Sequence, residues 1–406
     1  RSHVRAMRGR CHRGTVEENS MSPFVFNTTP SIVFEAGSSR RFGAIAGKRL
    51  GAKVLVVTDP GLRKLGLADP AIASLEQAGA IVTVFDEVEA DPSRTTLMRA
   101  VEAGRAAGVT GVAGFGGGSS LDVAKLAALL LGSGEDLDEA WGVAQAKGPR
   151  LPLALVPTTA GTGSEVTPVS IITVGEEEKR GVSSPVILPD VAVLDAELTL
   201  GLPAAITAAT GVDAMVHAIE AYASKNANNN PLSKMLARQA LRLLGANIET
   251  AVFNGRDVEA RGAMLLGSML AGQAFANSPV AAVHALAYPI GGTFHVPHGL
   301  SNALVLPHVL RYNAPDAAHL YAEIAADAFP RLGAEEGAQG RCAAFIEELA
   351  ALSKKLGMQT KLREVGIGED HLAKMASDAM KQQRLLVNNP REVREADALT
   401  IYKAAW

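Results

Sequence analysis

The sequence predicts an α/β half built on a parallel sheet, followed by an all-α half. Between residue 31 and about residue 200, short β-branched runs alternate with Ala- and Leu-rich amphipathic stretches. After about Leu202 the β-rich runs end, and the remaining segments follow helical spacing. The chain has 406 residues, which is long enough for two domains of about 100–200 residues each.

The first half is predicted to alternate strands and helices along the chain. Strands alternating with helices favour parallel strands in one sheet covered on both faces, with ligands beyond the carboxyl ends of the strands. The segment SIVFEAG at 31–37 is predicted to be an edge strand that could pair with a second copy of the chain. The other predicted strands are 53–59, 80–88, 111–118 and 151–159, and the predicted helices are 70–79, 93–108 and 120–132.

The second half reads as helices separated by short breaks. The asparagine cluster NANNNP at 226–231 and the PHG step at 297–299 interrupt the helical spacing. We therefore predict an α/β domain over 21–200 and a helical domain over 201–406. The first twenty residues are Arg-rich and poor in large apolar side chains, and we predict a disordered or non-native extension over 1–20, with Met21 as the natural start.

Composition excludes several function classes. The formal charge of −3 argues against nucleic acid or an anionic membrane as the main partner. No apolar run reaches the length of a membrane span. The only cysteines, Cys11 and Cys342, form no CxxC motif and no disulfide framework, so a cytoplasmic location is expected.

The stretch GFGGGSSLDVAK at 114–125 follows a strand and opens a helix. Glycines let the backbone approach a ligand, and a helix N-terminus offers free N–H groups to a pyrophosphate. The dinucleotide fingerprint is met only as far as Gly114-x-Gly116-x-x-Ser119, so the turn alone is also consistent with an ordinary strand–helix connection. Asp59 ends an earlier strand, where it could bind ribose hydroxyls and repel a 2′-phosphate, which favours NAD over NADP.

The helix segment GVDAMVHAIE at 211–220 places Asp213 and His217 four residues apart. Residues at i and i+4 lie on one helix face, so both side chains could bind one divalent cation. His284 and His298 complete a set of three imidazoles and one carboxylate, which suits Fe(II) or Zn(II) and leaves positions for a substrate oxygen. Spacing leaves His295 and His308 as competing ligands, and a helix cap with a core histidine as the structural alternative.

A third polar segment, PTTAGTGSEVT at 157–167, follows a strand. Its hydroxyls and glycines suit a polar ligand edge, or equally a loop with local hydrogen bonds.

Together with HALAYPIGGTFHVPHG at 284–299, which carries His284 and His298, these three motifs resemble the iron-containing (group III) alcohol dehydrogenase family over residues 24–406. The resemblance implies a Rossmann-like NAD-binding domain, a helical domain in a dehydroquinate synthase-like architecture, and a catalytic cleft between them. It implies an NAD-dependent alcohol dehydrogenase or aldehyde reductase with Fe(II), or alternatively Zn(II). The implied metal ligands are Asp213, His217, His284 and His298, and the implied cofactor residues are Asp59, Gly116, Gly117, Gly118, Ser119, Asp122, Thr158, Thr159, Thr162 and Lys179.

One position departs from the family pattern. Many members carry a second histidine four residues after His284, and this chain has Tyr288 there. A phenol ordinarily has a pKa of about 10, so it is a poor base near neutrality. We therefore expect Tyr288 to line the substrate pocket, with protons leaving through water at the metal or through His295.

Two related activities remain open alternatives. Hydroxyacid–oxoacid transhydrogenases carry tyrosine at the position of Tyr288, and maleylacetate reductases share the GGTF stretch. For the alcohol dehydrogenase itself, the expected substrate is small: a short-chain alcohol, a diol, a lactaldehyde-like compound or a semialdehyde. The resemblance also implies a homodimer or a larger homo-oligomer.

Overall fold

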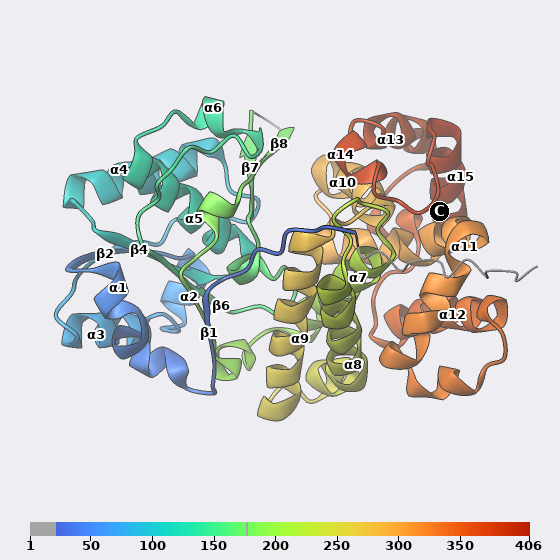
Figure 1. Cartoon of the computed structure of the whole chain (residues 1–406), viewed down its shortest axis with the longest axis horizontal. Helices are drawn as coiled ribbons and strands as arrows, with labels where there is room; N and C mark the ends of the chain where they lie inside the picture. The colour runs from blue at the N-terminus through green and yellow to red at the C-terminus, as the bar shows by residue number, and fades with distance from the viewer. Residues whose placement is uncertain (1–21, 176–177) are drawn as a thin grey trace, which may run out of the picture.

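The structure, a computed structural model, describes residues 22–175 and 178–406. Within these residues the α/β half and the helical half lie side by side, with the α/β half on the left of Figure 1. The extension predicted over residues 1–20 lies outside the described residues.

One parallel sheet organises the α/β half. In the part of the chain that the structure describes, it has six strands in the order β1-β9-β6-β4-β2-β3. Each neighbouring pair is parallel, so the predicted fold class is confirmed, and β1 is an edge strand as predicted. The strands are β1 (Ser31–Phe34), β2 (Lys53–Val57), β3 (Ile81–Phe85), β4 (Gly111–Gly116), β6 (Leu153–Pro157) and β9 (Val191–Leu194).

The two faces of this sheet belong to different hydrophobic cores. On β2, Leu55 and Val57 join one core, while Val54 and Val56 join the other. Successive side chains of a strand point to opposite faces, so an all-apolar strand is expected where both faces are covered. Helices α4 and α5 cover the first face and α3 the second. The helices of this half are α1 (Lys48–Leu50), α2 (Pro60–Lys64), α3 (Asp69–Gln77), α4 (Arg94–Ala107), α5 (Gly118–Ser133) and α6 (Leu137–Ala140).

A small second sheet stands beside α5 and was not anticipated from the sequence. Strand β7 (Val169–Val174) pairs antiparallel with β8 (Glu178–Ser183), and β5 (Gly142–Val143) pairs parallel with β8. The hairpin borders the space between the two halves (Figure 1).

The helical half has one continuous core of its own. Helix α8 begins after the predicted break at 226–231, with Asn230 accepting a hydrogen bond from the Ser233 amide, and α11 begins at the predicted PHG break. None of the described helices is both long and apolar enough to span a membrane. The helices are α7 (Ala204–Ala223), α8 (Pro231–Phe253), α9 (Val258–Asn277), α10 (Ala282–Phe294), α11 (His298–Ala328), α12 (Ala338–Lys355), α13 (Leu372–Ala379), α14 (Gln383–Leu386) and α15 (Glu395–Ala405).

The strands give way to helices between β9 and α7, where the sequence places the domain boundary. The segment before β1 nevertheless contacts the helical half. The backbone N–H of Asn27 donates to Asn277 Oδ1 at 2.6 Å, and the backbone N–H of Val25 donates to Asn228 Oδ1 at 2.9 Å. The division into domains at 200/201 stays a prediction, with this N-terminal strap crossing it.

Candidate active site

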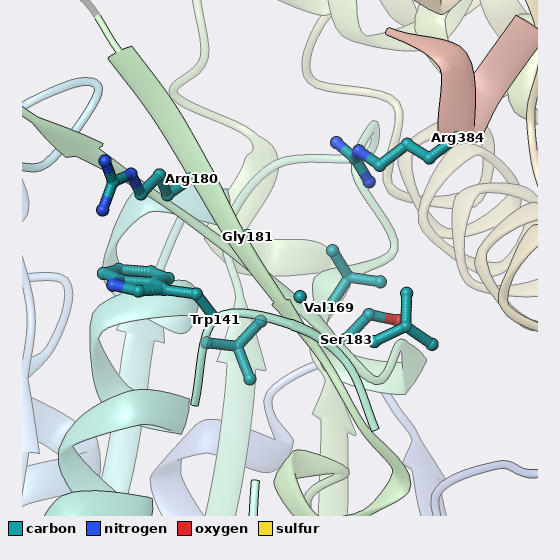
Figure 2. A pocket seen from close by; sticks show the side chains of 9 residues that line it. Trp141, Val169, Arg180, Gly181, Ser183 and Arg384 are labelled. Atoms are coloured by element: carbon teal, nitrogen blue, oxygen red, sulfur yellow. The ribbon is translucent and has the colours of Figure 1, made fainter. Parts of the chain in front are cut away.

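A cavity of about 540 Å³ lies between the two halves. Gly118, Ser119 and Lys179 line it from the α/β half, and the predicted metal ligands line it from the helical half. A smaller cavity of about 200 Å³ adjoins it over the hairpin and shares Arg384 with it (Figure 2).

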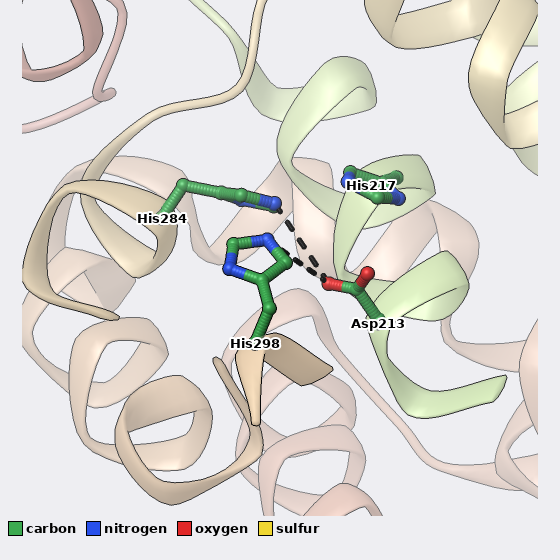
Figure 3. Close-up of side chains that lie close together, drawn as sticks. All are labelled: Asp213, His217, His284 and His298. Atoms are coloured by element: carbon green, nitrogen blue, oxygen red, sulfur yellow. Dashed lines mark ion pairs between the residues drawn. The ribbon is translucent and has the colours of Figure 1, made fainter. Parts of the chain in front are cut away.

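The four predicted metal ligands converge in this cavity. Asp213 and His217 lie one turn apart on α7, His284 lies in the first turn of α10, and His298 is the first residue of α11. One ligand atom from each lies within 4.8 Å of all the others (Figure 3). Three helices therefore bring an N3O donor set together, and neither His295 nor His308 belongs to it. The cluster is what a tetrahedral or open octahedral divalent cation requires of its protein ligands.

The orientation of two imidazoles is fixed by acceptors behind them. His284 Nδ1 lies 2.6 Å from Glu220 Oε2, and Glu220 Oε1 accepts the Val283 amide at 2.7 Å. His217 Nδ1 lies 3.2 Å from the Gly161 carbonyl oxygen. With Nδ1 carrying the proton in each ring, Nε2 keeps its lone pair for a metal.

The contacts of Asn302 show that the donor atoms of the predicted ligands converge. Its Nδ2 donates to Asp213 Oδ1 at 2.6 Å and lies 3.2 Å from His284 Nε2 and 3.3 Å from His298 Nε2. A single amide nitrogen thus reaches acceptor atoms of three predicted ligands, so their lone pairs converge. The donor set fits a divalent cation.

The electrostatics favour ligand forms that bind a metal. Burial lowers the pKa of His217 to about 3, so its ring is neutral at physiological pH. Burial alone would raise the pKa of Asp213, but the neighbouring imidazoles and the Asn302 amide together lower it, so the carboxylate is ionised. Neutral imidazole and ionised carboxylate are the forms that coordinate metal ions.

Glu220 and Asn302 are functional residues that the sequence reasoning missed. Glu220 follows Asp213 and His217 by a further turn of α7, so the same periodicity could have found it. Asn302 follows His298 by one turn of α11. Helical spacing is the signal in both cases, because positions i, i+4 and i+7 share a face.

The glycine turn leads from β4 into the N-terminus of α5. Gly116 has φ +152°, and a Cβ there would lie 2.8 Å from the Ser120 side chain, so only glycine fits. Gly117 is the N-cap residue without a side-chain capping bond, and a Cβ there would meet only Thr159, at 3.6 Å. The first amides of α5 are therefore accessible to an anion, as expected for a pyrophosphate site.

The PTTAGTGSEVT segment packs against this turn. The Thr158 amide donates to the Gly116 carbonyl oxygen at 2.9 Å, and a Cβ at Gly118 would lie 2.9 Å from Thr162 Cγ2. Thr162, Gly118 and Ser119 line the cavity. The structure therefore brings the glycine turn and the PTTAGTGSEVT segment together at the carboxyl ends of β4 and β6.

Asp122 and Lys125 hold this segment from α5. The Asp122 carboxylate accepts Ser164 Oγ at 2.7 Å and the Ile171 amide at 2.9 Å, so both of its oxygens already have protein partners. The fully buried Lys125, which sequence reasoning did not single out, donates to Ser164 Oγ at 2.8 Å and to the Val169 carbonyl at 2.7 Å. Both residues join α5 to the small sheet.

Two further predicted cofactor residues have different surroundings. Lys179 lies on β8 and lines the cavity, with Nζ 2.8 Å from Asp91 Oδ1 and 2.9 Å from Thr173 Oγ1. Asp59 follows β2, which neighbours β4, and caps α2 by accepting the Leu62 amide at 2.9 Å. Asp59 is not among the residues that line the cavity.

The two predicted proton-transfer residues, Tyr288 and His295, lie in different surroundings. Tyr288 lies one turn after His284 and lines the cavity, with its ring centroid 6.3 Å from that of His298. His295 instead ends α10 at φ +55°, is exposed and lies outside the cavity lining. Because His295 does not line the cavity, its expected role in conducting protons from the site stays a prediction.

Comparison with known proteins assigns the family. A family profile described as "Iron-containing alcohol dehydrogenase" matches residues 29–196, and one described as "Fe-containing alcohol dehydrogenase family, C-terminal" matches residues 207–406. Long-chain-alcohol dehydrogenase 1 of Geobacillus thermodenitrificans is 44% identical over 369 residues, covering 88% of this chain and 91% of that protein. The chain belongs to the iron-containing alcohol dehydrogenase family.

Two further proteins are similar to this chain over most of their length. The NAD-dependent methanol dehydrogenase of Bacillus methanolicus is 34% identical over 388 residues, covering 94% of this chain and 99% of that protein. The crystal structure of a 1,3-propanediol oxidoreductase matches with a TM-score of 0.91 at 35% identity, covering 95% of this chain and 100% of that one. The protein is therefore an oxidoreductase of alcohols or aldehydes, and the resemblance stated from the motifs is confirmed.

Proposed function

We propose that this protein is an NAD(H)-linked, metal-dependent alcohol dehydrogenase that interconverts a small alcohol and its aldehyde. The observation that supports this most strongly is the convergence of Asp213, His217, His284 and His298 in the cavity that the glycine turn also borders. When bound, NAD supplies the hydride acceptor, and Fe(II) or Zn(II) supplies a Lewis acid for the substrate oxygen.

The chain's own residues would bind and orient the reactants. The open N-terminus of α5 would hold the pyrophosphate through the amides after Gly117, and Thr159 and Thr162 would flank it. Lys179 would approach the ribose from β8, and Asp59 would favour NAD by its charge. Phe275 stacks on His217 with ring centroids 4.4 Å apart, so it shields that ligand from water.

Tyr288 is proposed to shape the substrate pocket without carrying the proton. It occupies a cavity position one turn from a ligand, but it makes no hydrogen bond with any of the four ligands. Replacement of Tyr288 by Phe should therefore leave the shape of the kcat-against-pH profile unchanged. Loss of one limb of that profile in Tyr288→Phe would show that the phenol takes part in proton transfer.

The activity test is oxidation of NADH with a panel of small aldehydes, diol-derived aldehydes and semialdehydes. We expect many turnovers of free NADH per enzyme. A transhydrogenase, which Tyr288 favours as a second candidate, would instead keep its nicotinamide bound and need a second substrate to turn over. Reduction of maleylacetate alone would favour the reductase alternative, and no NADH consumption with any member of the panel would contradict the proposal.

The oligomer and the location are also proposals. Strand β1 pairs only with β9 among the described strands, so its outer edge can take a strand from a second copy. Light scattering on the purified chain should give a dimer or larger. We propose a cytoplasmic location because the two cysteines of the sequence, Cys11 and Cys342, form no CxxC motif and are too few for a disulfide framework.

A further inference from the structure

The inference concerns Arg384, and it rests on the proposed function because it names the substrate class of the same site. Arg384 lies on the short helix α14, where it is exposed and directly precedes the buried Leu385. It lines both the main cavity and the smaller one over the hairpin. Figure 2 shows its side chain extending from the helical half toward the strands of the small sheet.

The other charged groups that line the main cavity already have partners within the protein. Lys179 pairs with Asp91 at 2.8 Å. Asp122 accepts two hydrogen bonds from protein groups, and Asp213 belongs to the ligand cluster. Within the described residues, Arg384 has no carboxylate within ion-pairing distance, and its guanidinium donates to the Tyr288 hydroxyl at 3.4 Å. The cavity therefore has an uncompensated positive charge at this end.

The Arg384 guanidinium lies one side chain away from the metal cluster, where the reacting end of a substrate would bind. Tyr288 contacts Arg384 through its hydroxyl, and its ring lies 6.3 Å from the ring of the ligand His298, centroid to centroid. One tyrosine side chain thus separates the guanidinium from the metal cluster. A short substrate whose oxygen meets the cluster would extend its far end toward Arg384.

The surroundings make the guanidinium selective for an anion. Val143, Val169, Val280, Leu385 and Val387 are among the residues that line the cavity near α14, the small sheet and the loop before α10. Apolar walls strengthen a charge pair relative to water. A guanidinium binds a planar or tetrahedral oxyanion through two parallel N–H groups, which an ammonium cannot do.

We propose that Arg384, assisted by the Tyr288 hydroxyl, is a specificity subsite for the anionic end of the substrate. The favoured substrates are short aldehydes with a terminal carboxylate or sulfonate, and the corresponding hydroxy acids in the oxidative direction. Arg384 determines specificity and takes no part in the hydride step.

The test compares aldehydes matched in length and different in charge. The pairs are malonic semialdehyde with propanal, succinic semialdehyde with butanal, and glutaric semialdehyde with pentanal, and sulfoacetaldehyde distinguishes sulfonate from carboxylate. In the wild type, kcat/KM should favour the anionic member of at least one pair by about 10–100-fold, the range expected for a hydrogen-bonded charge pair. Arg384→Gln should abolish this preference while retaining activity on the neutral member, and Arg384→Lys should keep part of it.

A matched control lies across the smaller cavity. The Arg180 guanidinium is already paired with Glu178 at 2.7 Å, so Arg180→Gln removes the same charge from the same region without removing a free one. This variant should keep the preference for the anionic aldehyde. Equal loss in Arg180→Gln and Arg384→Gln would mean a general field effect and would overturn the subsite.

Binding without turnover separates this inference from the proposed function. Calorimetric titration with 4-hydroxybutanoate should show binding to the wild type and loss of binding in Arg384→Gln, while 1-butanol should bind both equally. If no aldehyde is reduced yet this pattern appears, the subsite stands and the dehydrogenase proposal fails. If aldehydes are reduced without charge preference, or if Arg384→Gln raises KM for NADH with every substrate, the subsite is wrong and Arg384 contacts the cofactor.

Discussion

At the residue scale, the candidate site depends on Glu220 as much as on the ligands themselves. Glu220 is buried, and its carboxylate accepts hydrogen bonds from His284 Nδ1 at 2.6 Å and from the Val283 amide at 2.7 Å. One carboxylate therefore fixes both the tautomer of a ligand and the start of the helix that carries it. Acceptors of this kind raise the basicity of a metal-bound imidazole.

Replacing Glu220 by Gln should weaken metal binding by about 10–100-fold, as is typical of outer-sphere partners. The amide can accept only one of the two N–H groups and presents an NH2 group to the other. Competition with a fluorescent chelator would measure the affinity. Glu249→Gln is the control, because Glu249 pairs with Lys355 on the surface. An affinity for the metal that is the same in the wild type and Glu220→Gln would refute this role.

At the element scale, the strand–turn–helix unit of β4 and α5 forms the cofactor site. Gly116 and Gly118 are required by packing against Ser120 and Thr162, whereas a Cβ at Gly117 would make only an ordinary contact with Thr159. The glycines of one motif therefore serve different purposes: two allow close packing, and Gly117 leaves room for a ligand.

The change Gly117→Ala should therefore separate folding from binding. The added methyl group would meet Thr159 at 3.6 Å, an ordinary contact, and the Gly117 backbone is extended, so the melting temperature should not change. The same methyl group would stand over the first amides of α5, and the Kd for NADH should rise about tenfold, the cost of about one charge-assisted hydrogen bond. Gly340→Ala, at an open position in α12, is the control. Unchanged NADH affinity would place the pyrophosphate elsewhere.

Elements with a strong period could be predicted from the sequence, and those without one could not. The buried strands of the parallel sheet and the i, i+4 pair on α7 follow directly from apolar runs and helical spacing. The hairpin of β7 and β8 was missed because β8 is largely polar, EKRGVS, and its burial alternates weakly. Strand β8 is polar because it borders the cavity, where Lys179 pairs with Asp91.

Contacts between segments that are far apart in the chain could not be predicted from the sequence. Spacing could not choose between His298 and His308 or His295, because the choice depends on how α10 and α11 pack against α7. The Gly161 carbonyl on His217 and the Tyr288–Arg384 contact likewise join segments more than 50 residues apart. Only the tertiary structure brings these groups together.

At the scale of the whole molecule, the partly buried His308 affects how the stability of the fold depends on pH. Burial, together with nearby Arg311 and Lys361, lowers the pKa of His308 to about 4 from 6.5. The unfolded chain therefore binds more protons than the folded chain between these pH values. The stabilising effect of a neutral His308 is complete above pH 6.5 and is lost as the pH falls toward 4.

His308→Gln should accordingly flatten the fall in unfolding free energy between pH 7 and pH 5. The difference in slope should be at most about 1.4 kcal/mol per pH unit, the value for one proton. Urea unfolding of chelator-treated protein at several pH values would measure it. His319→Gln is the matched control, since His319 is exposed on the same helix. Identical slopes for wild type and His308→Gln would contradict the assignment.

The central claim is that Asp213, His217, His284 and His298 hold the catalytic metal. The most direct test strips the protein with chelator, reloads it separately with Fe(II) and Zn(II), and measures bound metal and NADH-dependent aldehyde reduction on the same samples. The account predicts that activity disappears on stripping and returns in proportion to metal bound, up to a single ion per chain, and that Asp213→Asn neither retains the metal nor recovers activity. Activity that is indifferent to stripping, or metal bound equally well by Asp213→Asn, would contradict it.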